Sequence, residues 1–367
     1  MRRAYYDHLS SLGDSEELQR EVEAHITQYG KGPIWQHFAE HHPALVRPDA
    51  PFKINKSRAA ATRPAYVGVT DFDWFTSLAS QPGLEEVNFW RPGLQRFRGL
   101  APGQPFIFKL RAPRNMIAGF GHFRRYDRLP LWLAWDVFGT ANGAASEVEL
   151  RERLAKLGKD KALLTDPERQ IGCITLSDCV FLPPDEWLTP PSDWSSNIVS
   201  GKGYDIGVSE GRRVWDSLLA AAGDLGVARE EAAGTARYGA PQTVLPRLGQ
   251  QSFRLAVRDA YGACAVTGEH SLPVLDAAHI QPYAQGGKHQ LINGMLLRRD
   301  VHRLFDLGYV TVTPEYRFAV SDELRAQYDN GRVYYKMAGT KLGLPLDQSE
   351  QPDKESLAWH GENVFRG

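Results

Sequence analysis

Two histidines and an asparagine in the last third of the chain constrain its fold more than any other feature of the sequence. His279 lies in a short run that is predicted to be a strand, Leu275 to Ile280. Asn293 follows 14 residues later, after a glycine-rich loop, and His302 comes nine residues further on, in a predicted helix from Arg299 to Leu307. The chain therefore places two imidazoles, which serve as bases and metal ligands, on neighbouring predicted elements.

The residues around these positions resemble those of the HNH nucleases, in the branch found among restriction endonucleases. The matching stretches are Ala277-Ala278-His279-Ile280, Asn293-Gly294 and His302-Arg303-Leu304-Phe305-Asp306, and the resemblance runs from Arg247 to the C-terminus. It implies a ββα-metal fold that holds one divalent ion and hydrolyses phosphodiester bonds. His279 is then the general base, Asn293 fixes the loop and the base by side-chain hydrogen bonds, and His302 ligates the metal. An imidazole with a pKa of about 6.5 can accept a proton at neutral pH.

The metal ligands follow the family pattern only in part. Many members have an acid or a histidine immediately before the base, where this chain has Ala278. Asp276, two residues earlier on the same strand face, is a substitute ligand or else a turn or cap residue. Asp306 shares a helix face with His302, four residues away, and is a second ligand or else a structural carboxylate.

Oxygen-rich ligation with one imidazole suits Mg²⁺ or Mn²⁺, with Ni²⁺ or Co²⁺ as alternatives. The cysteine pairs that bind zinc in some relatives are absent, because Cys173, Cys179 and Cys264 are scattered. We therefore expect a divalent metal cofactor and no structural zinc. His270 and His289 are expected to be surface histidines.

Basic residues around the motif suit phosphate binding. Between residues 247 and 303, seven basic residues face four acids, a local charge of +3. The predicted DNA contacts among them are Arg247, Arg254, Arg258, Lys288, Arg298 and Arg299. Such residues bind the backbone largely without reading the base sequence. The alternative is a solvated helix face.

A length of 367 residues predicts two or three domains, at roughly 150 residues each. We expect a helical leader and linker over 1–60, a base-reading domain over 61–208, a helical connector over 209–246 and the nuclease over 247–367. Short apolar runs between Gly and Pro turns predict strands over Tyr66 to Val69, Pro105 to Leu110, Met116 to Phe123 and Ile171 to Leu182. Strands with a few inserted helices favour a small, partly open β-barrel, so the expected fold class is α+β.

A strongly basic stretch lies within the predicted reading domain. The whole chain has 43 Lys and Arg against 44 Asp and Glu, so any argument for nucleic acid must be local. Residues 91–128 hold nine basic residues and one acid, a local charge of +8. Arg111, Arg114, Arg124 and Arg125 of this stretch are predicted DNA contacts. The alternative is a basic face without a partner.

The runs Pro102 to Leu110 and Ile117 to Phe123 resemble the strand pair of PUA-superfamily barrels, which include SRA, EVE and ASCH-type modules. Several members bind a modified base that is flipped out of the duplex, because a pocket cannot reach a base inside the stack. By this resemblance, the pocket candidates are Asn88, Phe89, Trp90, Trp132 and Trp135, with Asn88 to Trp90 at the start of a loop. The alternative for each aromatic residue is a place in the core.

Together the two resemblances predict a modification-dependent, type IV-like restriction endonuclease. It would bind double-stranded DNA that carries a modified cytosine, a ligand class suggested by analogy between folds. One metal site per chain suggests a homodimer or two sequential nicks. The runner-up is a defence DNase whose first domain senses a nucleotide or protein signal, and a third interpretation is a DNA-binding module with a decayed nuclease core.

We expect a cytoplasmic protein without a membrane partner. No run approaches the roughly 20 apolar residues of a membrane-spanning helix, and the N-terminus lacks the apolar core of a signal peptide. The odd number of cysteines fits a reducing compartment.

Overall fold

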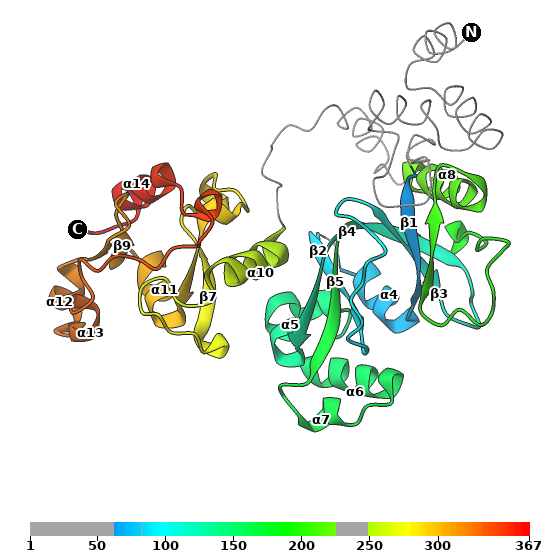
Figure 1. Ribbon diagram of the computed structural model, residues 1–367, viewed down its shortest axis with the longest axis horizontal. Coiled ribbons are helices and arrows are strands. Elements are labelled where there is room, and N and C mark those ends of the chain that lie inside the picture. The colour runs from blue at the N-terminus through cyan, green and yellow to red at the C-terminus, as the bar shows by residue number, and fades with distance from the viewer. Residues whose placement is uncertain (1–61, 82, 225–248) are drawn as a thin grey trace, which may run out of the picture. The chain divides into compact units, whose positions relative to one another are not determined.

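The computed structural model describes residues 62–81, 83–224 and 249–367. Its first part is built on a six-stranded mixed sheet with the strand order β2-β5-β4-β3-β1-β6. The strands are β1 (Pro64–Thr70), β2 (Glu86–Arg91), β3 (Pro105–Leu110), β4 (Ile117–Pro130), β5 (Gln170–Phe181) and β6 (Gly201–Asp205) (Figure 1). β1 and β3 pair in parallel, and the other neighbours pair antiparallel. The class is α+β, while closure of the sheet into a barrel stays a prediction.

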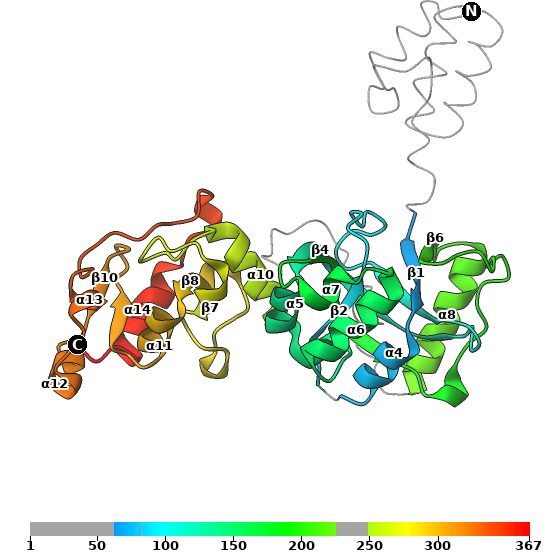
Figure 2. The same ribbon diagram turned by 90° about the horizontal axis from the view of Figure 1, so that it is seen from below.

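Among the described residues, five α-helices accompany this sheet, and Figure 2 shows their arrangement. They are α4 (Phe72–Ala79), α5 (Leu131–Phe138), α6 (Glu147–Gly158), α7 (Ala162–Thr165) and α8 (Ser209–Asp224). Side chains cap two of them: Asp71 Oδ1 accepts a hydrogen bond from the backbone N–H of Trp74, and Ser146 Oγ accepts one from Glu149. The predicted leader and linker, and the connector beyond residue 224, lie outside the described residues.

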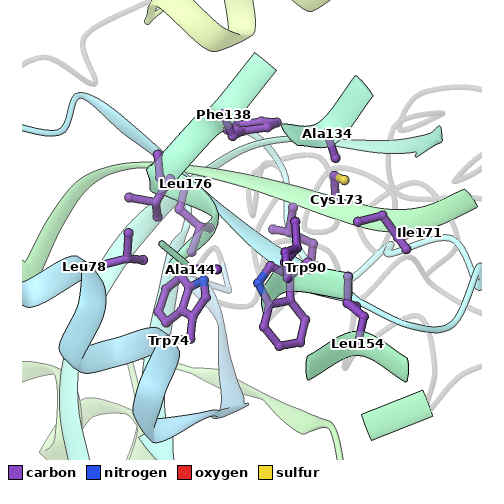
Figure 3. Close-up of a cluster of buried hydrophobic side chains, with 14 of the residues drawn as sticks. Trp74, Leu78, Trp90, Ala134, Phe138, Ala144, Leu154, Ile171, Cys173 and Leu176 are labelled. Atoms are coloured by element: carbon purple, nitrogen blue, oxygen red, sulfur yellow. The ribbon is translucent and has the colours of Figure 1, made fainter. Parts of the chain in front are cut away.

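Aromatic side chains fill the core beside the sheet. Figure 3 shows Trp74 and Trp90 among its buried side chains. Their indole N–H groups donate to the backbone oxygens of Asn88 and Asn142, at 2.9 and 2.8 Å. The expectation that Asn88 and Trp90 begin a loop is wrong, because β2 pairs with β5 along its whole length. The side chain of Trp90 is largely buried and packs in the core.

The second part of the chain begins with α10 (Gln250–Tyr261). It continues with β7 (Leu275–His279), β8 (Gly294–Arg298), α11 (Arg299–Asp306), β9 (Val310–Val312), β10 (Phe318–Val320), α12 (Glu323–Tyr328), α13 (Arg332–Tyr335) and α14 (Lys354–Asn363). β7 and β8 pair antiparallel, and α11 follows β8 directly, so these three elements form a ββα unit (Figure 2).

The partner of β7 is β8, a strand that the sequence did not predict. Met295, Leu296 and Leu297 of β8 are almost completely buried, so this strand is covered on both faces. A continuous apolar run of this length does not show the alternation that marks a half-buried strand. Among the described residues, no helix is both long enough and apolar enough to cross a membrane.

Candidate active site

His279 is the last residue of β7, and packing holds its ring. Phe253 of α10 stacks on the imidazole, with ring centroids 4.0 Å apart and 15° between the planes. His279 Nε2 lies 2.9 Å from Nδ1 of His289. Gly294 is opposite His279 in the hairpin, where a Cβ atom would come within 2.7 Å of the Phe253 ring. Glycine at this position therefore allows α10 to approach the hairpin closely enough for the stack.

Burial also tunes the basicity of His279. Burial, followed by the charges of His289, His302 and Arg254, lowers the pKa of His279 to about 4. The imidazole is therefore neutral at physiological pH and has a lone pair with which to accept a proton.

A cleft of about 610 Å³ brings the candidate catalytic groups together. Asp276, His279, His302 and Asp306 all line it. His302 lies between the two carboxylates: its Nδ1 is 3.2 Å from Asp276 Oδ2, and its Nε2 is 3.5 Å from Asp306 Oδ1. The structure thus places both predicted acidic ligands beside the predicted histidine ligand.

The two carboxylates differ in their environments. Burial raises the pKa of Asp276, but the hydrogen bond and charge of His302, with the charges of Arg254 and Arg299, outweigh burial and lower it overall. For Asp306, burial is the largest effect, and its pKa is raised. Asp276 is therefore more readily ionised than Asp306 in this geometry.

Within the described ranges, no three His, Cys, Asp or Glu side chains form a ready group for a metal ion. The pair Asp276 and His302 nevertheless fits one. Ligand atoms at about 2.1 Å from an ion and at right angles lie about 3.0 Å apart, close to the 3.2 Å between Asp276 Oδ2 and His302 Nδ1. Because an imidazole ligates one ion through one nitrogen, His302 in this orientation can share an ion with Asp276 or with Asp306.

Asn293 does not line the cleft but ties the loop that follows β7. Its side chain is almost fully buried. Its Oδ1 accepts from the backbone N–H of Gln281 at 2.9 Å, and its Nδ2 donates to the backbone oxygens of Gln281 and Lys288 at 2.9 and 3.0 Å. The amide of Asn293 thus bonds to the backbone at Gln281 and at Lys288, and it holds both ends of the segment 281–288 together.

We expect Asn293→Ala to lower the free energy of unfolding by about 1–3 kcal/mol for each buried backbone group that is left unpaired. Cleavage should fall as well, because the loop next to His279 loses its clamp. Urea unfolding and a cleavage assay on the same preparation measure the two effects. The control is Asn330→Ala, at an exposed asparagine whose Oδ1 accepts only from the neighbouring Gly331 N–H. Equal stability of the two variants would contradict the clamp.

Several predicted phosphate contacts pair with nearby carboxylates. The pairs are Arg254 with Asp276, Arg258 with Asp259, Arg298 with Asp300, Arg124 with Asp178 and Arg125 with Asp127. The guanidinium of Arg114 lies over the Phe72 ring, 3.3 Å from its centroid. Lys288 and Arg299 are exposed, and Arg247 lies outside the described residues. The role of these residues in DNA binding stays a prediction.

A second and larger pocket, of about 1100 Å³, lies in the sheet part of the chain. Phe89 and Trp90 line it, together with Lys109, Arg111 and Trp194. Asn88, Trp132 and Trp135 do not line it. Asn88 is fully buried and donates to Asn142 Oδ1, and Trp132 donates to Glu168.

Sequence reasoning missed Lys109 and Trp194 as pocket residues. Lys109 Nζ lies 5.2 Å from the centroid of the Trp194 ring and donates to Asn115 Oδ1 at 2.8 Å. Burial lowers its pKa. The available signal was a lysine inside an apolar strand, where a charge is costly unless it has a function or a partner.

His289 was also missed, because it was expected at the surface. Its side chain is only 11% exposed, and the ring is stacked on Tyr283 with 4.6 Å between centroids. That expectation is wrong, because the loop after β7 folds back and places His289 against His279, the last residue of β7. His270, by contrast, is exposed as expected.

A model of the HNH endonuclease family matches residues 264–313, which span β7, β8, α11 and β9. The chain therefore contains an HNH endonuclease domain and is a nuclease, an enzyme that hydrolyses phosphodiester bonds; metal dependence is general among HNH endonucleases.

A search of curated proteins finds no match. Among solved structures, the chain is similar to ASCH from Zymomonas mobilis, with 10% identity and a TM-score of 0.30 over 41% of this chain and 94% of that one. It is also similar to the modification-dependent TagI restriction endonuclease, with 11% identity and a TM-score of 0.25 over 78% of each chain. Both likenesses are distant.

Proposed function

We propose that the protein is a modification-dependent restriction endonuclease that binds double-stranded DNA with a modified cytosine and cuts the DNA backbone. The observation that carries the proposal is the large aromatic and cationic pocket in the sheet part, because the nuclease cleft by itself offers no means of choosing a base. The pocket and the cleft share no lining residue. One site can therefore recognise DNA while the other cuts it.

The chemistry of the cleft suits hydrolysis. Neutral His279 removes a proton from a water molecule, and the resulting hydroxide attacks phosphorus. Asp276 and His302 would hold the divalent ion, with Asp306 as the alternative acid. The ion, when bound, stabilises the charge on the phosphate and the leaving oxygen. We expect 5′-phosphate and 3′-hydroxyl ends.

The chemistry of the larger pocket suits an extruded nucleotide. Phe89 and Trp194 provide aromatic faces on which a base can stack, and Lys109 and Arg111 provide positive charge for its phosphate. Arg111 Nε is buried and has no hydrogen-bond partner among the described groups. A volume of about 1100 Å³ leaves room for a base that carries an added group. We propose that modified cytosine is this base.

The test compares plasmids that are identical except for their cytosines, which are unmodified, methylated, hydroxymethylated or glucosylated, with Mg²⁺ or Mn²⁺ present. Cutting of one or more modified plasmids, and not of the plain one, supports the proposal. Unselective cutting that appears only after a nucleotide is added would favour the signal-gated DNase. Binding to DNA without any cutting would favour the decayed nuclease core.

Trp194→Ala is expected to weaken the preference for modified over plain DNA. One base–aromatic stack is worth about 1–3 kcal/mol, so the preference should fall by roughly 5- to 150-fold. Competition binding with matched duplexes measures the ratio. Trp132→Ala is the control, because Trp132 does not line the pocket. Trp90→Ala is a less informative variant, since Trp90 is 6% exposed and its loss would disturb the core.

A further inference from the structure

His289 lies directly behind the candidate base. It belongs to the loop between β7 and β8, and its ring packs edge-on against His279, with 5.0 Å between centroids and 66° between planes. Tyr283 stacks on its other side, at 10°. His279 lines the cleft with Asp276 and His302, whereas His289 does not. His289 thus contacts the candidate base without lining the cleft itself.

The distance between the two rings defines how their protons are arranged. His279 Nε2 and His289 Nδ1 are 2.9 Å apart, so one must donate and the other accept. If His289 donates, His279 carries its own proton on Nδ1 and offers no lone pair to water. If His279 donates, its proton is on Nε2, and the Nδ1 atom of His279 keeps its lone pair. Only the second arrangement makes His279 a base.

We propose that His289 is a positioning residue of the nuclease: its Nδ1 accepts a hydrogen bond from Nε2 of His279 and thereby directs the basic Nδ1 of His279 to the attacking water. This proposal rests on the assignment of His279 as the general base. Among the described residues, no hydrogen bond involves His279 Nδ1, and this atom is not one of the fully buried unpaired ones, so water can reach it. The hydrogen bond of one ring nitrogen sets the tautomer of a histidine and so the role of the other nitrogen.

Two substitutions separate the hydrogen bond from the packing of the ring. His289→Phe keeps an aromatic ring against Tyr283 but has no acceptor. His289→Asn loses the ring but keeps an acceptor atom bonded to Cγ, as Nδ1 is. Under single-turnover conditions, on whichever DNA the wild-type enzyme cuts best, we expect His289→Phe to slow the cleavage step by about 10- to 100-fold, as loss of groups that orient a catalytic ligand commonly does. His289→Asn should stay within about tenfold of the wild type, and DNA binding should be unchanged in both.

A spectroscopic measurement tests the same proposal without any cleavage. Nitrogen-15 NMR of histidine-labelled full-length protein distinguishes the two tautomers of an imidazole. We expect His279 to carry its proton on Nε2 in the wild type and in His289→Asn, and to show a mixture of tautomers in His289→Phe. Thermal unfolding of all variants reports whether each is folded.

Three results would overturn the proposal. They are wild-type cleavage by His289→Phe, an equal loss in His289→Phe and His289→Asn, or a proton on His279 Nδ1 in the wild type. A wrong assignment of His279 as the base would give a different result. His279→Ala would then still cut DNA, independently of the effects of the substitutions at residue 289.

Discussion

His279→Ala is expected to slow DNA cleavage by about 10²- to 10⁴-fold, the range that a positioned general base contributes. The affinity for DNA should stay close to that of the wild type, because the imidazole is neutral and contributes no charge to phosphate binding. The stack on Phe253 is lost, so the variant should also be somewhat less stable. Single-turnover cleavage and a direct binding assay measure rate and affinity separately.

The matched control for this variant is His270→Ala, because His270 belongs to the same domain, is exposed and does not line the cleft. It should cut at the wild-type rate. A His279→Ala protein that is folded, binds DNA and cuts as fast as the control would show that another group activates the water.

His302→Ala is expected to abolish tight binding of the divalent ion and, with it, cleavage. Loss of groups that merely support a metal ligand costs about 10- to 100-fold, and loss of a ligand should cost more. Asp276 and Asp306 would also lose the imidazole between them and repel each other more strongly. Titration calorimetry with Mn²⁺, followed by cleavage at increasing Mn²⁺, measures the effect. Partial recovery at high Mn²⁺ is the expected sign of a lost ligand.

The two acids can then be distinguished. Since His302 Nδ1 faces Asp276 and Nε2 faces Asp306, only one of Asp276→Asn and Asp306→Asn should weaken Mn²⁺ binding as strongly as His302→Ala does. The lowered pKa of Asp276 and the ligand-like distance favour Asp276. Asp300→Asn is the control on the same helix, where the carboxylate pairs with Arg298. Unchanged Mn²⁺ binding in His302→Ala would remove this histidine from the metal site.

Local patterns predicted many elements well. The apolar run Pro105–Leu110 is a strand with the predicted bounds, and the helix predicted from Arg299 to Leu307 is observed over Arg299–Asp306. The cap of α4 at Asp71 is equally local, because a short acceptor side chain before a helix satisfies one of its first N–H groups. Such features depend on residues that are adjacent in the sequence, so they can be predicted without knowledge of the fold.

Features that depend on distant partners were predicted poorly. The buried strand β8 lacks the alternation that marks a strand, and Asn88 to Trp90 become part of β2 only because β5 pairs with them. His289 looks like any polar loop residue until the loop folds back and places its ring 2.9 Å from His279 Nε2. Lys109 and Trp194 are far apart in the chain and meet only through the fold.

The sequence by itself determined that the chain carries a nuclease domain, because the residue types, their order and their spacing from Cys264 to Thr313 are specific enough to identify it. It also determined which residues are candidates for the chemistry. Only the tertiary structure decided which acids stand beside His302, which histidine meets Nε2 of His279 and which aromatic rings line the larger pocket. The physical reason is that hydrogen bonds, stacking and ligation act over a few ångströms between atoms that the linear order of residues does not bring together.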